Sequence, residues 1–387
     1  MSPVYLDYNA TTPLDPAVRL AMQPFWEGYW GNPSSVHQIG QAARAALDQC
    51  RYRLASRWHA KPSEVVFTSG GTEANNLAIF GTARCLRAAG RGRNLITSPI
   101  EHHAVLHAFQ YLARHEGFEV TYLPVDHCGR VQVSDVAAAL RPDTGLVSVM
   151  TANNEVGTIQ PVAEIGALCR ARKVLFHTDA VQAFGKLPFR DIHQFQADLV
   201  SVCAHKFHGP KGAGALYIRS PWLPHPTQLG GGHENERRAG TENLMAIAGL
   251  VTAFELGVPE PVFPADRLAP LRRELAAAAA AIPGVTLRGD FENGLPNTVA
   301  FTVTGTDSIA LMAGLDLAGV CASSGSACSA GSIEPSHVLQ AMRVPAAEAN
   351  ALVRLSLGRE TTVDEVNHTI RVLPEVIQRL RRTADRR

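Results

Sequence analysis

The sequence predicts an α/β fold in which helices sandwich a mostly parallel sheet, followed by a smaller α+β domain. Before residue 258, short apolar runs typical of strands alternate with helical patterns. Several of these runs are followed directly by polar residues capable of chemistry. A proline-rich stretch at 258–264 then marks a candidate domain boundary, and 387 residues exceed what one core usually holds.

The strands expected before the boundary are apolar runs bounded by turn-forming residues. They lie at 64–68, 94–97, 120–123, 146–150, 174–179, 199–205 and 215–218. Helical patterns separate many of them, at 72–90, 103–115 and 161–172. Strand followed by helix, repeated, favours parallel pairing because the chain must cross back over the sheet before each new strand.

Fewer elements follow the boundary, and they alternate in type. We expect helix 267–282, strand 298–303, helix 307–317, a strand near 319–323, helix 335–342, strand 352–357 and a terminal helix from about 362. The sequence therefore predicts a large domain over 16–257. A small domain is expected to combine 1–15 with 258–387.

Composition excludes several classes of protein. The 36 basic and 35 acidic residues give a net charge of +1 and form no basic stripe that would follow a nucleic acid. Seven cysteines without a C-x-x-C spacing argue against a disulfide framework or a zinc site, and we expect no resident metal. The N-terminal residues do not resemble a signal peptide, and no apolar run reaches the ~20 residues of a membrane span. We therefore expect a cytoplasmic protein that contacts neither membrane nor nucleic acid.

Polar groups follow five of the expected strands, where parallel strands share one edge of the sheet and ligands usually bind. They are the segments 69–76, 101–103 and 153–155, Asp179 with Gln182, and His205 with Lys206. The first of these segments opens a helix with Gly71 and Thr72, which form either a simple turn and cap or a phosphate site. Neither a G-x-x-x-x-G-K-[ST] loop nor a G-x-G-x-x-G fingerprint is present at a strand end.

Lys206 is the most informative of these residues because lysine is rarely buried and this one follows an apolar strand. It is either a lysine that snorkels to the edge of the sheet or an amine that bonds covalently to a carbonyl group. Lys211 is a weaker candidate for this amine because it lies in an exposed Gly-Pro turn. Asp179 either caps a helix or faces a pyridinium nitrogen. A phosphate site, a reactive lysine and an acidic strand end together predict pyridoxal 5'-phosphate.

Two further residues have competing interpretations. His102 either stacks on the cofactor ring or binds a metal with neighbouring histidines, for which a third ligand is missing. Arg354 shares a strand face with Ser356 by alternation and is either solvated or grips a substrate carboxylate.

Motifs along nearly the whole chain resemble the cysteine desulfurases, a branch of the class V, fold-type I pyridoxal-phosphate enzymes. The motifs are YLDYNATTP at 5–13, GNPSSVH at 31–37, TSGGTEANN at 68–76, EHHAV at 101–105, NNEVGTIQP at 153–161, HTDAVQAFGK at 177–186, AHKFHGPKGAGALY at 204–217, RRAGTEN at 237–243, SSGSAC at 323–328 and RLSLGRETT at 354–362. The SSGSAC loop is similar to the group that supplies sulfur for iron–sulfur clusters and nitrogenase. The resemblance implies conversion of L-cysteine to L-alanine, with sulfur held as a persulfide and passed to an acceptor such as an iron–sulfur scaffold protein.

The resemblance also implies a role for each site residue. Lys206 would bond to the cofactor and move protons, Asp179 would hold the ring nitrogen, Gln182 the ring hydroxyl, and His102 would stack on the ring. The cofactor phosphate would be held by Gly71, Thr72, Cys203 and His205, and by Thr241 of a second subunit, which implies a homodimer. Asn154, beside the cofactor, and Arg354 would bind the substrate carboxylate.

Cys328 would be the nucleophile that accepts sulfur, and it is a candidate transient ligand for an iron–sulfur cluster. Its surroundings, rich in glycine and serine, predict a loop able to move between a buried ring and an outside acceptor. A free surface cysteine is the alternative. Cys321 is expected to pack at a strand end instead.

One position departs from the pattern of these enzymes. Serine is usual where this chain has Cys203, and a thiol is the weaker hydrogen-bond donor. The chain also ends soon after its terminal helix, where longer relatives contact scaffold proteins. Two other functions are compatible with the motifs: a different class V enzyme, such as an aminotransferase or selenocysteine lyase, and a sulfur-relay or scaffold-binding protein with vestigial catalysis.

Overall fold

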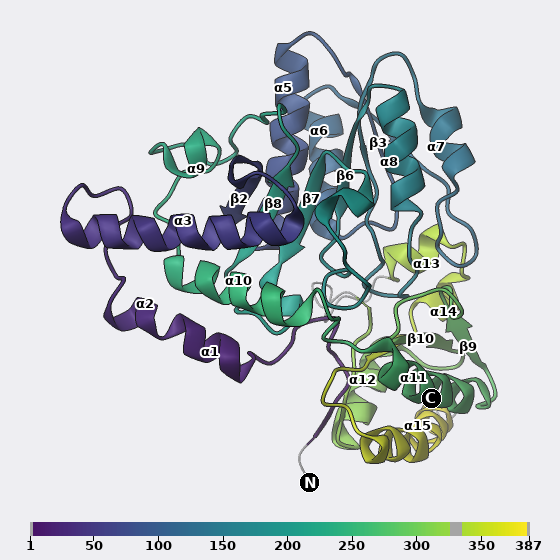
Figure 1. Cartoon of the computed structure of the whole chain (residues 1–387). Helices are drawn as coiled ribbons and strands as arrows, with labels where there is room; N and C mark the ends of the chain where they lie inside the picture. The colour runs from purple at the N-terminus through teal and green to yellow at the C-terminus, as the bar shows by residue number, and fades with distance from the viewer. Residues whose placement is uncertain (1–2, 326–334, 385–387) are drawn as a thin grey trace.

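A computed structural model describes residues 3–325 and 335–384 and contains a large mixed sheet above a smaller antiparallel one (Figure 1). The large sheet has the order β2-β8-β7-β6-β5-β3-β4. Its strands are β2 (Val65–Thr68), β3 (Asn94–Thr97), β4 (Glu119–Tyr122), β5 (Thr144–Ser148), β6 (Leu175–Asp179), β7 (Leu199–Cys203) and β8 (Gly214–Ile218). β8 runs antiparallel to both of its neighbours, and the other pairs are parallel. The predicted α/β class is confirmed.

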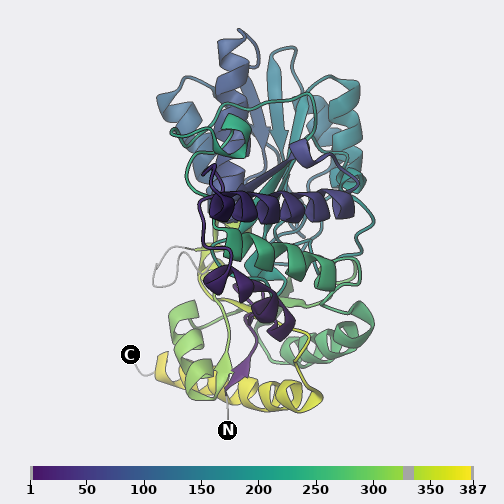
Figure 2. The ribbon, with the colours of Figure 1, turned by 60° about the vertical axis from the view of Figure 1, so that its left-hand side comes forward.

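Helices cover both faces of this sheet because the strands bury alternate residues on opposite sides. On one face Val200 and Val202 of β7 pack in the main core with α3 and α10, whereas Leu199 faces the other side. Figure 2 shows α3 and α10 crossing that first face side by side. The helices of the large part are α1 (Pro16–Met22), α2 (Pro24–Glu27), α3 (Gln38–Trp58), α4 (Gly71–Asn76), α5 (Thr82–Ala88), α6 (His103–His115), α7 (Val133–Ala139), α8 (Val162–Ala171), α9 (His233–Glu236) and α10 (Leu244–Gly257).

The smaller part contains a second core built on a three-stranded antiparallel sheet with the order β12-β10-β9. The N-terminal strand joins this part, because β1 pairs in parallel with β11. The strands are β1 (Val4–Tyr5), β9 (Val285–Arg288), β10 (Thr298–Val303), β11 (Val320–Cys321) and β12 (Leu352–Ser356). The helices are α11 (Ala265–Ala280), α12 (Ser308–Leu317), α13 (His337–Ala341), α14 (Ala346–Ala349) and α15 (Val363–Ala384). We propose that the two cores correspond to the two domains, divided at 15/16 and 257/258.

Two expected elements differ from the structure. The helix expected over 72–90 is divided into α4, a π-helical turn at Leu77–Gly81 and α5. The strand expected over 199–205 ends at Cys203, and Ala204–Lys206 form a 3-10 turn. Alternation along the longer expected strand would put His205 on the same face as Ser201 and Cys203, but His205 lies beyond the end of β7. The long helix α3 was not predicted at all.

Within the described residues, no helix combines the length and the apolar character needed to cross a lipid bilayer.

Candidate active site

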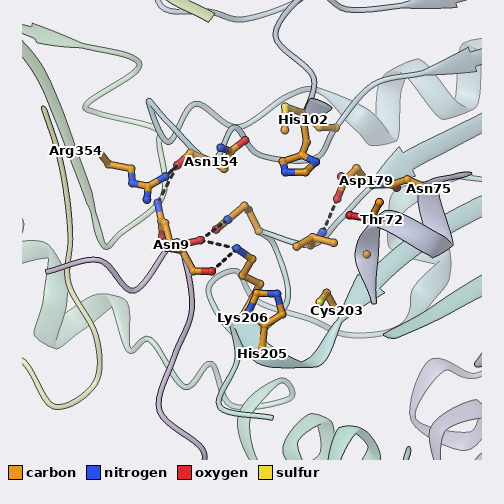
Figure 3. A pocket seen from close by; sticks show the side chains of 15 residues that line it. Asn9, Thr72, Asn75, His102, Asn154, Asp179, Cys203, His205, Lys206 and Arg354 are labelled. Carbon is orange, nitrogen blue, oxygen red and sulfur yellow. Dashed lines mark hydrogen bonds between the residues drawn. The ribbon is translucent and has the colours of Figure 1, made fainter. Parts of the chain in front are cut away.

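A cavity of about 270 Å³ lies where the carboxyl ends of β2, β5, β6 and β7 meet β12 of the small part. Ten of the predicted site residues line it: Gly71, Thr72, His102, Asn154, Asp179, Gln182, Cys203, His205, Lys206 and Arg354. Figure 3 shows Arg354 and Asn154 at one end, Asp179 and Thr72 at the other, and His102 and Lys206 on opposite sides. The side chains that the sequence placed at the strand ends therefore lie around one cavity.

Two predicted residues are not part of this arrangement. Thr241 is exposed and does not line the cavity. Cys328 lies outside the described residues.

Asp179 ends β6 and is almost completely buried, yet the cavity wall gives it only neutral donors. Its Oδ2 accepts a hydrogen bond from Nδ2 of Asn75 at 2.7 Å, and its Oδ1 accepts from the backbone N–H of Val181 at 3.0 Å. These bonds orient the carboxylate and place no positive charge directly against it. Such a group is suited to hold a protonated nitrogen. Asn75 was missed because it lies within a run of polar residues, although its helical position, one turn after Thr72, puts it on the same side.

The start of α4 provides a cradle that leaves no room for a side chain. A Cβ on Gly71 would come within 2.9 Å of Cγ2 of Val181 and 3.4 Å of Cβ of Cys203. Thr72 follows with a hydroxyl group, and free N–H groups at a helix start attract anions. This end of the cavity fits a phosphate group.

His205 lies beside that cradle and is uncharged. Burial, and then the positive charge of Lys206, lowers the pKa of His205 to about 3. Its Nδ1 hydrogen-bonds Oγ1 of Thr11 at 3.1 Å. The neutral imidazole can therefore offer one hydrogen bond to the anion site but no ionic attraction.

Lys206 is partly buried, and its amine has no carboxylate partner among the described residues. Its Nζ donates to the carbonyl oxygens of Asn9 at 2.8 Å and Ala10 at 2.7 Å. Burial, with Arg354 nearby, lowers the pKa of Lys206 from 10.5 to about 8. A lysine near this pKa supplies an appreciable fraction of free amine at neutral pH, as a nucleophile requires. The snorkelling interpretation is therefore the weaker one.

His102 occupies the N-cap of α6, which fixes its ring at the cavity wall. Its Nδ1 accepts a hydrogen bond from the backbone N–H of Ala104 at 3.1 Å. Burial and the positive charge of Lys206 lower the pKa of His102, so the ring is neutral with its proton on Nε2. A neutral aromatic ring opposite Lys206 is suited to stack on another aromatic ring between them (Figure 3).

Arg354 is 1% exposed, so the solvated-face interpretation is wrong. One face of β12 packs in the small core, and the other faces the cavity. Its Nη2 pairs with Oδ1 of Asp7 at 2.6 Å, and its Nη1 donates to the carbonyl oxygens of Asn154 at 2.8 Å and Gly325 at 2.7 Å. Its Nε is buried without a partner in the described structure. A guanidinium with an unfilled donor beside the cavity is suited to bind a carboxylate.

The aminotransferase class-V family matches residues 4–368. A cysteine desulfurase IscS from Dictyoglomus turgidum is 46% identical over 98% of this chain and 95% of its own length. A NifS-like protein of known structure superposes with a TM-score of 0.90 at 36% identity, covering 98% of this chain and all of that one. A structure described as SspA in complex with cysteine has a TM-score of 0.79 at 35% identity, covering 92% and 99%. These matches show that the chain belongs to the class V pyridoxal-phosphate enzymes and, within them, to the cysteine desulfurases.

Proposed function

We propose that this protein removes sulfur from L-cysteine, releases L-alanine and holds the sulfur as a persulfide on Cys328. The observation that carries the proposal is the order of groups along the cavity, from Thr72 of the anion cradle through Asp179 and Lys206 to Arg354 (Figure 3). This order suits an aromatic phosphate placed end to end with an amino acid, with the phosphate at the cradle and the amino acid toward Arg354. The relative solved with cysteine supports the substrate class.

Pyridoxal 5'-phosphate, when bound, supplies an electron-withdrawing ring that weakens bonds at the substrate's α and β carbons. Asp179 would keep the ring nitrogen protonated, and Gln182 would donate to the ring hydroxyl. His102 would cover one face of the ring, and Lys206 would approach from the other. Lys206 would bond covalently to the cofactor at rest and carry protons to and from the substrate carbon.

The substrate carboxylate would lie against Nε of Arg354 and the side chain of Asn154. This position directs the substrate's amino group toward Lys206. The Cys328 thiolate would attack the substrate sulfur, so that a sulfur–sulfur bond forms as the carbon–sulfur bond breaks. The electron pair of the broken bond stays with the carbon skeleton, which Lys206 protonates on the way to alanine.

The activity is tested by incubating the purified protein with L-cysteine and a thiol reductant. We expect alanine and sulfide in equal amounts, and loss of both in Cys328→Ala. The matched control is Cys321→Ala, seven residues earlier in β11, which should keep the wild-type rate. Sulfide release at the wild-type rate from Cys328→Ala would contradict the persulfide. Alanine formed from pyruvate with another amino donor, without sulfide from cysteine, would indicate an aminotransferase.

The thiol of Cys203 allows a second prediction about the cofactor. Cys203 lies at the cradle, and its Sγ donates a long hydrogen bond of 3.9 Å to the carbonyl oxygen of Ala213. A hydroxyl group donates better than a thiol, so Cys203→Ser is expected to tighten cofactor binding by about tenfold, the size of one hydrogen bond to a charged group. The apparent Kd is measured by fluorescence as apoprotein is titrated with cofactor. Cys321→Ser should leave it unchanged, and an unaltered Kd in Cys203→Ser would mean that the phosphate relies on other groups.

We further propose that the active unit is a homodimer in which Thr241 completes the partner's phosphate site. Thr241 is exposed and does not line the cavity of its own chain, so it is available to a second subunit. Large apolar side chains are also exposed around α2 and before α9, where a second copy would cover them: Trp26, Trp30, Val36 and Leu229.

The sulfur acceptor is proposed to be a protein thiol, most simply on an iron–sulfur scaffold, because a persulfide transfers its outer sulfur to another thiolate. We place this chemistry in the cytoplasm, since the cysteines in the described part of the chain are free thiols, which a reducing compartment preserves.

A further inference from the structure

Lys186 is a buried amine directly behind the cavity wall, and none of the roles above uses it. It is 1% exposed, and its Nζ donates to Oδ1 of Asn9 at 2.7 Å and to Oε1 of Gln182. The ring of Phe263 lies 5.3 Å away. No carboxylate in the described structure pairs with it, and burial, Lys206 and Arg354 lower its pKa well below the usual value. Burying an amine without a counter-ion is costly, so its retention calls for a reason.

Two contacts, with Asn9 and with Lys186, determine which way round the Gln182 carboxamide lies. The backbone carbonyl oxygen of Asn9 can only accept, so the amide group facing it must be Nε2, which donates to it at 3.0 Å. The amide oxygen then faces Lys186 and accepts from its amine. The reverse orientation would set oxygen against oxygen at Asn9 and, with the charged amine, donor against donor at Lys186. Gln182 also lines the cavity, and the bond to Asn9 uses only one of the two N–H groups on its Nε2.

Further hydrogen bonds fix both the side chain and the backbone of Asn9, so the contacts around Gln182 are rigid. Its Oδ1 also accepts from Nδ2 of Asn297 at 3.1 Å, and its Nδ2 donates to Oγ1 of Thr298 at 2.9 Å. The backbone N–H of Asn9 donates to Oγ of Ser356 at 2.9 Å. The carbonyl oxygen of Asn9 accepts hydrogen bonds from both Nε2 of Gln182 and Nζ of Lys206. Lys186 thus links residues of the small part to the amide in the cavity wall.

We propose that Lys186 is a positioning residue that holds Gln182 as a hydrogen-bond donor, and never an acceptor, toward the cofactor ring. The inference rests on the proposed function, because it requires the pyridoxal ring in the cavity. A fixed donor stabilises the ionised form of the ring hydroxyl over the protonated form. Without Lys186 only the hydrogen bond to the Asn9 carbonyl oxygen opposes a turn of the amide oxygen toward the ring, and such a turn favours the protonated form instead.

The test follows the cofactor's visible absorption band across pH in the purified holoenzyme. Lys186→Met keeps the length of the side chain and removes the donor. We expect the apparent pKa of the band to rise by at least about one pH unit, the size of one hydrogen bond to a charged group. Lys173→Met, which removes an exposed lysine outside the cavity, is the control and should titrate like wild type. A band in Lys186→Met that titrates like wild type would overturn the inference.

A double variant separates positioning from the charge of the amine. If Lys186 acts through Gln182, Gln182→Leu alone should raise the apparent pKa, and adding Lys186→Met should change nothing further. A shift by Lys186→Met that persists in the Gln182→Leu background would mean that the amine acts directly on the ring and would overturn the positioning role.

A third variant covers the case in which Lys186→Met does not fold. Gln182→Glu gives Lys186 a carboxylate partner and removes the N–H from the cavity, so it should fold, and its band should titrate at higher pH. A wild-type titration in Gln182→Glu would exclude the donor role. If the wild-type protein itself carries no such band, the proposed function fails together with this inference, whereas a wild-type band insensitive to Lys186 and Gln182 removes the inference alone.

Discussion

Replacement of Lys206 by methionine is expected to lower L-cysteine turnover by at least about a thousandfold. The amine is proposed both to bond to the cofactor and to move protons at the substrate carbon, and proton transfer by a positioned side chain alone contributes about 10²–10⁴. Turnover is measured as alanine formed per enzyme, with Lys211→Met as the matched control. Lys211 lies five residues later in an exposed Gly-Pro turn and should be dispensable for chemistry.

The lowered pKa of Lys206 adds a pH dependence that distinguishes chemistry from folding. The pKa is about 8 in the folded protein and 10.5 for an unperturbed lysine, so the unfolded chain binds more protons between these values. Lys206 should therefore make the stability of the apoprotein rise with pH from about 8 to 10.5, and Lys206→Met should reduce the observed rise by this contribution. Below pH 8 the variant is expected to be more stable than wild type, since burial of the charged amine is relieved. A variant that is inactive and less stable would indicate a folding defect, and one that retains activity would exclude Lys206 as the reactive amine.

The cavity residues that the sequence could group in advance are those at the ends of parallel strands. Strands with one direction end at one edge, so His102, Asn154 and Asp179 could be grouped without knowing any contact. The same logic places Gly71 and Lys206, although a short 3-10 turn, and not the strand itself, carries Lys206.

The small part contributes residues to the cavity through pairings between segments that are distant in the sequence. Local sequence patterns do not encode such pairings. Asn9 reaches the cavity because β1 pairs with β11 and the segment after it bonds to Ser356, 347 positions away. Two interpretations of Arg354 stayed open because alternation along β12 does not reveal that both faces of this strand are covered. Its ion pair with Asp7 joins the two ends of the chain.

Helix α3 escaped prediction for a related reason. Its buried side includes Gly40, Cys50 and Arg51 among apolar residues, so no clean apolar stripe marks it. Arg51 can be buried because Glu234, 183 positions away, accepts two hydrogen bonds from its guanidinium. A buried ion pair of this kind becomes visible only when both partners are placed in space.

Arg354→Lys is expected to lower kcat/KM for L-cysteine by about 30-fold or more, chiefly through KM. The expectation follows from the range of about 2–5 kcal/mol for removing one partner of a buried, hydrogen-bonded charge pair. Arg354 donates to Asp7, Asn154 and Gly325 while keeping Nε free, and a lysine ammonium cannot hold this fork. Arg359→Lys, a neighbouring arginine paired with Asp15 and Glu360, is the control and should behave like wild type.

Comparison of L-cysteine with cysteamine, which lacks the carboxylate, isolates the role assigned to Arg354. The wild-type protein should prefer cysteine strongly, and Arg354→Met should lose most of that preference while its cofactor absorption stays unchanged. Removing the guanidinium also leaves the Asp7 carboxylate without its partner, so Asp7 would repel the substrate carboxylate. Asp7→Asn in the Arg354→Met background is therefore expected to recover part of the activity toward cysteine but none toward cysteamine. The expected loss of preference in Arg354→Met depends on an attraction between the guanidinium and the substrate carboxylate, which cysteamine lacks. If Arg354→Met still prefers cysteine over cysteamine, another residue must recognise the carboxylate.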